Sequence, residues 1–183
     1  GYTFGGWYSD SDFKNRVRYI ENGSTGKKTL YAKWTATRYK VTYVLNGGYN
    51  NQYNPLTYTV TTNHFSYKPA TRKGYRFLGW YSDKACTKRT YQVKKGSVGN
   101  KTVYAKWTLN RYKITYVLNG GKNNRKNPTT YTIYTATTAY QNPTRSGYRF
   151  AGWYTDKACT KRTYQVKKGS TGNKTLYAKW IKK

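Results

Sequence analysis

Few side chains in this sequence could carry out catalysis. His64 is the only histidine, and the residue 73 positions later, at the matching point of a repeated pattern, is Thr137. Asp83 and Asp156 are the only acids between positions 38 and 183. Paired-carboxylate hydrolysis needs two carboxyl groups flanking one bond, and metal sites need clustered ligands. The inventory therefore predicts a protein that is not an enzyme and that has no metal site and no cofactor.

The acids and cysteines recur at matching positions. Asp83 and Asp156 each follow a Trp-Tyr-Ser/Thr sequence, and we expect them to cap a turn or a helix. Cys86 and Cys159 share one repeat position, where an incomplete first copy has Phe13. A position that takes either Cys or Phe suggests a buried apolar slot, because free Cys behaves as a small hydrophobe. A disulfide between the two would need Cα atoms within about 7 Å.

Charge is the dominant compositional feature. The chain has 35 Lys and Arg against 5 Asp and Glu, which gives a formal net charge of +30. Such a charge attracts polyanions, including nucleic acids, teichoic acid, sulfated or uronic glycans and anionic membrane surfaces. Aromatic residues make up 19% of the chain, whereas disordered segments are poor in them. Since Tyr, Thr and Val also favour strands, we expect folded, β-rich modules.

The sequence repeats with a period of 73 residues. Its tryptophans show the period directly: Trp7, Trp80 and Trp153 form one series, and Trp34, Trp107 and Trp180 form another. This period exceeds the roughly 20–50 residues of solenoid units, so we expect separate small modules, like beads on a string. We define residues 1–37 as the half repeat, because they match only 74–110, residues 38–110 as the first full repeat and residues 111–183 as the second full repeat.

Each full repeat is predicted to be mainly β, or a small α+β unit. In the first full repeat we expect strands at 38–46, 57–62 and 102–107, a turn at Gly47-Gly48 and a short helical turn within 84–90. The spacing of several aromatic residues suggests a core, formed by Tyr75, Phe77, Trp80, Tyr104 and Trp107. The half repeat lacks the first two strands, which predicts an unpaired sheet edge. Either an upstream segment or a neighbouring copy of the chain would complete it.

Four sequence elements resemble the Listeria–Bacteroides repeat, which is related to the B repeat of internalins. They are GYRFLGWYSD at 74–83, KTVYAKW at 101–107, VTYVLNGG at 41–48 and NPTTYT at 127–132. The resemblance implies small β-grasp-like modules in tandem on secreted or wall-attached bacterial surface proteins, serving as stalks and in adhesion. It therefore implies an extracellular location, at the bacterial cell surface or in the cell wall. No run of about 18 apolar residues is present, so no transmembrane segment is predicted.

One basic segment, KACTKRTYQVKKGS, occurs unchanged at 84–97 and 157–170. The half repeat has a net charge of only +3, from 6 cations and 3 acids. The full repeats reach +12, from 13 cations and one acid, and +15, from 16 cations and one acid. The doubled segment therefore predicts a repeated cationic face that binds an anionic polysaccharide, either teichoic acid or a host surface glycan such as glycosaminoglycan. The candidate residues are Lys88, Arg89, Lys94, Lys95, Lys161, Arg162, Lys167 and Lys168.

Two alternatives remain open for this charge. The cations could form a solvated surface on a purely structural spacer that has no ligand. The chain could also bind nucleic acid without sequence specificity, although no helix-turn-helix, RNP or zinc-finger pattern is present. Binding to any polyanion weakens with salt, because condensed counterions are released. Salt dependence therefore does not distinguish one polyanion from another, and each class has to be tested directly.

Overall fold

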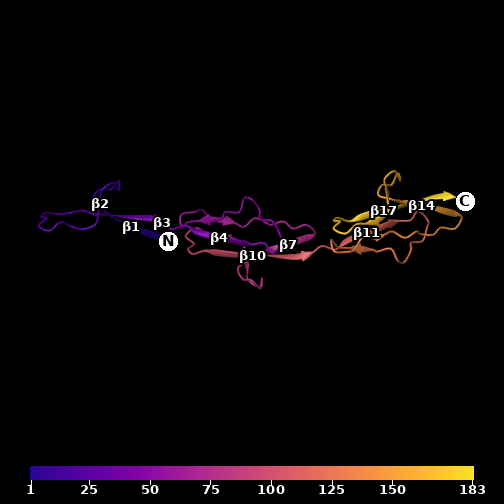
Figure 1. The fold of residues 1–183 in the computed structure, drawn as a ribbon, viewed down its shortest axis with the longest axis horizontal. Helices are drawn as coiled ribbons and strands as arrows, with labels where there is room; N and C mark the ends of the chain where they lie inside the picture. Colours follow the sequence, from indigo (N-terminus) through magenta and orange to yellow (C-terminus); the bar gives the residue numbers. More distant parts are fainter. The chain divides into compact units, whose positions relative to one another are not determined.

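The computed structural model describes residues 1–183, and its regular structure consists of strands only (Figure 1). The strands are β1 (Tyr2–Tyr8), β2 (Arg16–Val17), β3 (Tyr31–Ala36), β4 (Tyr39–Val44), β5 (Thr57–Tyr58), β6 (Phe65–Ser66), β7 (Tyr75–Tyr81), β8 (Arg89–Thr90), β9 (Gln92–Val93), β10 (Lys101–Leu109), β11 (Tyr112–Val117), β12 (Thr130–Tyr131), β13 (Thr138–Ala139), β14 (Tyr148–Tyr154), β15 (Arg162–Thr163), β16 (Gln165–Val166) and β17 (Lys174–Lys182). The predicted mainly β fold class is confirmed.

The chain divides into two compact units. The first consists of Gly1–Thr71 and Phe77–Lys106, and the second of Arg72–Arg76 and Trp107–Lys183. Residues 72–76 belong to the second unit, where the Tyr75 hydroxyl lies 2.6 Å from the Tyr134 hydroxyl. The predicted repeat boundaries at 37/38 and 110/111 follow the sequence period and stay predictions.

A five-stranded mixed sheet forms the centre of each full repeat. In the first full repeat the strand order is β5-β4-β10-β7-β8, with β4 parallel to β10. The second full repeat has the same order, β12-β11-β17-β14-β15, with β11 parallel to β17. A parallel pair needs a long crossover connection, and here the crossover contains the short strands of the repeat. Two of these form a separate antiparallel pair, β6 with β9 and β13 with β16.

The half repeat has only a three-stranded antiparallel sheet, in the order β2-β1-β3. It has no counterpart of β4, and the corresponding edge of β3 is unpaired. The strand that borders this edge is also shorter. β3 begins at Tyr31, whereas β10 begins at Lys101, which corresponds to position 28. In β10 the three additional residues pair with β4, so the parallel neighbour extends the strand.

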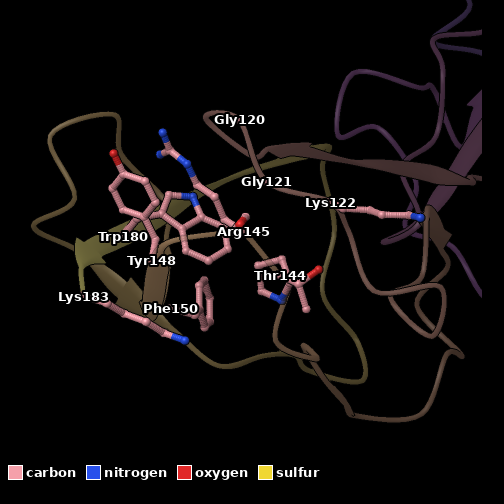
Figure 2. Close-up of a pocket in the computed structure, with 11 residues that line it drawn as sticks. Gly120, Gly121, Lys122, Thr144, Arg145, Tyr148, Phe150, Trp180 and Lys183 are labelled. Carbon is pink, nitrogen blue, oxygen red and sulfur yellow. The ribbon is translucent and has the colours of Figure 1, made fainter.

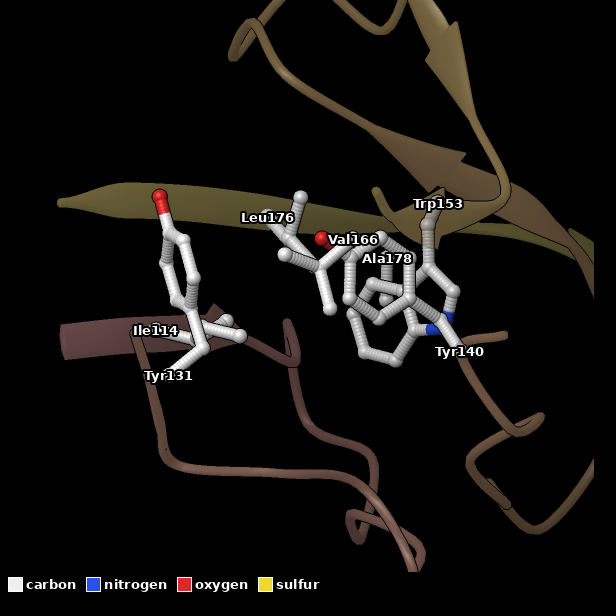
Figure 3. Packing of buried hydrophobic residues seen from close by; sticks show 7 residues of the cluster. All are labelled: Ile114, Tyr131, Tyr140, Trp153, Val166, Leu176 and Ala178. Atoms are coloured by element: carbon white, nitrogen blue, oxygen red, sulfur yellow. The ribbon is translucent and has the colours of Figure 1, made fainter. Parts of the chain in front are cut away.

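Seven buried side chains form the core of the second full repeat (Figure 3). They are Ile114, Tyr131, Tyr140, Trp153, Val166, Leu176 and Ala178. In β17 the side-chain alternation directs Leu176 and Ala178 into this core, as in β10 it buries Val103 and Ala105. The expected core of the first full repeat is confirmed for Trp80, which is buried, while its other four aromatic residues are half-buried.

Two local predictions differ from the structure. The second expected strand is shorter, because Thr59 leaves β5 and accepts a hydrogen bond from the amide of Thr62 in a turn. The helical turn expected within 84–90 is wrong. Cys86 has a left-handed backbone with φ of 52°, which ends any right-handed helical run, and β8 begins at Arg89.

Candidate anion-binding site

An aspartate organises the turn that precedes the candidate cations. The Asp83 carboxylate accepts hydrogen bonds from the amides of Thr87 and Lys88, the latter at 2.6 Å, and from the Thr87 hydroxyl. The backbone donors at Thr87 and Lys88 lower the pKa of Asp83. Asp156 makes the same contacts in the second full repeat. The predicted capping role of both acids is confirmed. The only carboxylate of each full repeat is therefore engaged in hydrogen bonds within its own turn.

The repeat position that holds either Cys or Phe lies inside this turn. Phe13, Cys86 and Cys159 all have left-handed φ angles, between 52° and 55°. Their side chains are half-buried, so the predicted buried slot is covered only in part. Local turn geometry sets this position at the surface rather than in the core. Both cysteines are free, and no disulfide joins them.

Arg89 is held flat against the sheet at the start of the basic segment. Its guanidinium lies over the ring of Tyr91, 5.2 Å from the centroid. The same side chain lies close to Gly79, where an added Cβ would be 2.8 Å from the Arg89 Nε. Gly79 also has a φ of 139°, which other residues rarely adopt. Both the lack of space for a side chain and the backbone conformation therefore favour glycine here. Arg162 repeats this arrangement.

Lys94 and Lys95 begin the turn that follows β9. The amide of Gly96 in this turn donates a hydrogen bond to the Val60 carbonyl at 3.0 Å, which ties the lysines to the turn after β5. In the second full repeat, Gly169 donates to Ile133 at 2.9 Å in the same way. The four candidate cations of each repeat therefore occupy two places along one segment, the start of β8 or β15 and the turn after β9 or β16.

All eight candidate cations are exposed, and none forms a salt bridge. The ion pair in this protein joins Lys14 to Asp12 in the half repeat, at 3.4 Å. The single acid of each full repeat, Asp83 or Asp156, is engaged by backbone amides and forms no ion pair with the basic segment. Four cations within eight residues therefore outnumber the one nearby carboxylate and give each segment a positive local field that a flexible polyanion could use.

Exposed tyrosines lie between the cations, and the sequence analysis did not single them out. Tyr91 and Tyr164 are 62% and 64% exposed, and each has an arginine over its ring. An aromatic face flanked by cations suits a sugar ring that carries acidic groups, because the ring stacks while the cations contact the charge. The signal was present in the sequence, as an aromatic residue interleaved in a basic run.

A second patch combines cations with aromatic rings in a pocket of about 570 Å³ (Figure 2). Its lining includes Lys122, Arg145, Tyr148, Phe150, Trp180 and Lys183. The Trp180 indole N–H donates to the Leu118 carbonyl at 2.8 Å and its ring lies 5.5 Å from that of Phe150. The Arg145 guanidinium stacks 3.8 Å from the Tyr148 ring centroid. The tertiary structure brings these distant residues together, so no local motif could have predicted the pocket.

The half repeat has the same turn with little of the charge. At the positions of Lys94 and Lys95 it has Glu21 and Asn22, and at the position of Lys88 it has Asn15. Only Arg16, which corresponds to Arg89, is kept and packs against Gly6. The turn geometry therefore does not require the lysines, and their presence in both full repeats needs another explanation.

Other kinds of site have little support in the structure. No group of three or more His, Cys, Asp or Glu side chains could hold a metal ion. No helix is present that is long and apolar enough to cross a membrane.

Comparison with known proteins identifies the repeat. The family model of the Listeria-Bacteroides repeat domain matches residues 1–33, 39–106 and 112–179, which together cover most of the chain. Each match begins at or just after a predicted repeat start, and the first corresponds to the half repeat. No solved structure matches this chain.

Three longer bacterial proteins contain similar sequence. A protein of Evansella cellulosilytica named as a Gly-rich membrane protein is 30% identical over 98% of this chain and 20% of its own length. A second protein of that organism, named as a membrane protein, is 31% identical over 98% of this chain and 28% of its own length. Internalin H of Listeria monocytogenes is 32% identical over 94% of this chain and 32% of its own length. The chain thus spans a fifth to a third of these relatives.

Proposed function

Because this chain belongs to the Listeria–Bacteroides repeat family, we propose that it is a stalk segment of a bacterial cell-surface protein, whose basic segments bind anionic polymers. Its relatives, Internalin H and proteins named as membrane proteins, support a location at the cell surface or in the cell wall. The ligand class is teichoic acid or a glycosaminoglycan. The role is binding rather than catalysis.

The observation that carries this proposal is the exposure of all eight cations without any acid partner. A surface that only needs solubility gains at least as much from acids, yet each full repeat has a single acid, engaged in a turn. Two copies of the segment in one chain could engage one polymer together. Linked weak sites gain apparent affinity without any new contact, provided that one ligand spans both.

The first test compares immobilised heparin, poly(glycerol phosphate) and double-stranded DNA at matched ionic strength. We expect the chain to stay bound to heparin or poly(glycerol phosphate) well above physiological salt. Its affinity for the polymer should fall steeply as the salt concentration rises. Stronger retention on DNA than on either would favour the nucleic-acid alternative. Elution from all three near physiological salt would leave the spacer role as the function of the segment.

The second test locates the binding surface. Replacing Lys94, Lys95, Lys167 and Lys168 with Gln removes four charges from the basic segments. The matched control replaces four other exposed lysines, Lys40, Lys68, Lys113 and Lys126, and so has the same net charge. We expect the first variant to elute at clearly lower salt than the control. Equal elution would mean that overall charge, and not the basic segment, determines binding.

A further inference from the structure

A cleft of about 330 Å³ lies beside the basic segment of the first full repeat. The end of this segment and the first residues of β10 line it, and Tyr67, Ser82 and Thr90 complete its wall. All of these residues belong to the first compact unit. The cleft is therefore a feature of one complete repeat. Its volume is near the lower end of the range for small-molecule pockets, which suits a single sugar unit.

The floor of the cleft is apolar and its rim is polar. Val93 and Val103 form the floor, because they line the cleft and are only 4% and 2% exposed. A sugar ring has the same division, since its C–H face is apolar and the hydroxyl groups around it donate and accept hydrogen bonds. Matching groups are present on the polar rim, which consists of Ser82, Thr90, Gln92, Ser97 and Thr102.

Two lysines make the cleft cationic. Lys94 belongs to the basic segment, and Lys101 begins β10. Lys101 is half-buried and forms no ion pair, and the lining of the cleft contains no acid. A half-buried cation without an acid partner favours an anionic ligand. Lysine acts as a point charge and lacks the planar fork by which arginine matches a carboxylate, so a sulfate group suits this pair.

The two full repeats differ inside this cleft. Of the residues that line it, only Ser82 and Val103 change between the repeats. Their counterparts in the second full repeat are Thr155 and Leu176, and each is larger by one carbon atom. Because both changes add volume to the wall or the floor, the second full repeat has less room at this place.

Side-chain contacts in the second full repeat agree with this difference. Leu176 is fully buried in the core that Figure 3 shows, and the hydroxyl of Tyr140 in that core has no hydrogen-bond partner. Lys174, the counterpart of Lys101, lies over the ring of Tyr131, 5.6 Å from the centroid. The lysine there has an aromatic partner within its own repeat, whereas Lys101 lines the cleft.

We propose that the cleft of the first full repeat binds one sulfated sugar unit of a glycan chain. The ring rests on Val93 and Val103, its hydroxyl groups form hydrogen bonds with the polar rim, and its sulfate lies between Lys94 and Lys101. This inference rests on the proposed function, because Lys94 belongs to the basic segment. It selects a glycosaminoglycan as the polymer, since poly(glycerol phosphate) has no ring to cover the apolar floor.

The first test titrates the full chain with a sulfated disaccharide from heparin and follows amide NMR signals residue by residue. We expect saturable shifts at Ser97 and Thr102 of the first full repeat. The desulfated disaccharide and glycerol phosphate should each bind at least about tenfold more weakly, because the first lacks the charge and the second lacks the ring. Equal affinity for glycerol phosphate would overturn the ligand class, and the absence of shifts at both residues would overturn the site.

Exchanging the lining residues between repeats tests the cleft without changing any charge. Ser82→Thr with Val103→Leu should weaken disaccharide binding to the first full repeat by at least about tenfold, because the added carbons fill the cleft. Thr155→Ser with Leu176→Val should strengthen binding to the second full repeat. Each introduced side chain already occurs at the matching position of the other repeat, so both variants should fold. Unchanged affinity in both variants would overturn the proposal.

A lysine substitution separates this inference from the proposed function. Lys101→Gln should lower the affinity for the disaccharide by at least about tenfold. The matched control Lys113→Gln, which removes an exposed lysine of the second full repeat, should not lower it. If the chain is retained on heparin and Lys101→Gln binds the disaccharide normally, the cleft is wrong and polyanion binding stands. If heparin does not retain the chain, the proposed function is wrong, and the disaccharide titration still decides whether the cleft binds a sulfated sugar.

Discussion

The half repeat and the full repeats share one motif but use it differently. The β1–β3 pair and the β14–β17 pair have the same antiparallel register and the same irregularity, after Phe4 and after Phe150. The arginine packed on a glycine is also present in both, as Arg16 on Gly6 and Arg162 on Gly152. Yet only the full repeats have a closed core. The second half of a repeat therefore determines its own hairpin, and the first half determines whether the aromatic face is buried.

The largest expected difference between the two regions concerns the shared tryptophan. Trp153→Ala should destabilise the second full repeat by about 3–5 kcal/mol, because it removes a buried ring and the hydrogen bond from its indole. Trp7→Ala should cost less than about 1 kcal/mol, since about half of that residue's surface is already exposed.

Amide exchange of β17 and β3 at increasing urea measures both losses in the intact chain. Equal losses of stability in the two regions would show that Trp7 is in a closed core in solution. The proposed difference between the half repeat and the full repeats would then be wrong.

The next largest difference between the two regions should be their stability at alkaline pH. Burial raises the pKa of Tyr67 and of Tyr140 to about 12, and the half repeat has no counterpart of either residue. A raised folded pKa means that the folded state keeps its proton longer. This contribution to stability is complete below the unfolded pKa of about 10 and is lost as the pH rises towards 12.

Near-ultraviolet circular dichroism should therefore show the full repeats losing structure in this pH window. Tyr67→Phe with Tyr140→Phe should move that transition to higher pH, because phenylalanine has no proton to lose. An unchanged transition in the double variant would assign it to other groups.

The smallest effect should be common to both regions. Hydrogen bonds from backbone amides lower the pKa of Asp10, Asp83 and Asp156, of which the first belongs to the half repeat. A lowered folded pKa gives stability that is present above the unfolded value of about 3.9 and is lost as the pH falls below it. Asp10→Asn and Asp156→Asn should each reduce this acid dependence slightly, and to a similar extent.

Amide exchange at the two turns, measured between pH 5 and pH 3, checks this prediction. If only the turn of the second full repeat lost protection from exchange, that turn would depend on the closed core and not only on local hydrogen bonds.

Much of the local structure could be predicted from the sequence. Alternating apolar residues located the strand that contains Val103 and Ala105, the paired glycines located the turn after β4, and the position of Asp83 predicted its capping role. These features depend on neighbouring residues along the chain, so a local pattern carries the information. The eight candidate cations are all exposed, as four lysines and arginines within eight residues without partners must be, and their role in binding stays a prediction.

The predictions that failed or were missed depend on tertiary neighbours or on exact turn geometry. The strand predicted at 57–62 is shortened to two residues, because Thr59 turns away. Arg89 lies flat because Gly79, ten residues earlier, leaves room beneath it. The pocket at Trp180 contains residues from Gly120 to Lys183 that only strand pairing brings together.

The sequence by itself determined the repeat period, the strand-rich composition, the scarcity of acids and the family. The sequence also predicted that the half repeat lacks two strands, and the tertiary structure decided which side chains of the shared motif those strands cover in the full repeats. Trp7, Trp80 and Trp153 have almost the same neighbours along the chain, so no local pattern distinguishes them. Their burial differs because a parallel strand from a distant part of the chain lies beside two of the hairpins and not beside the third.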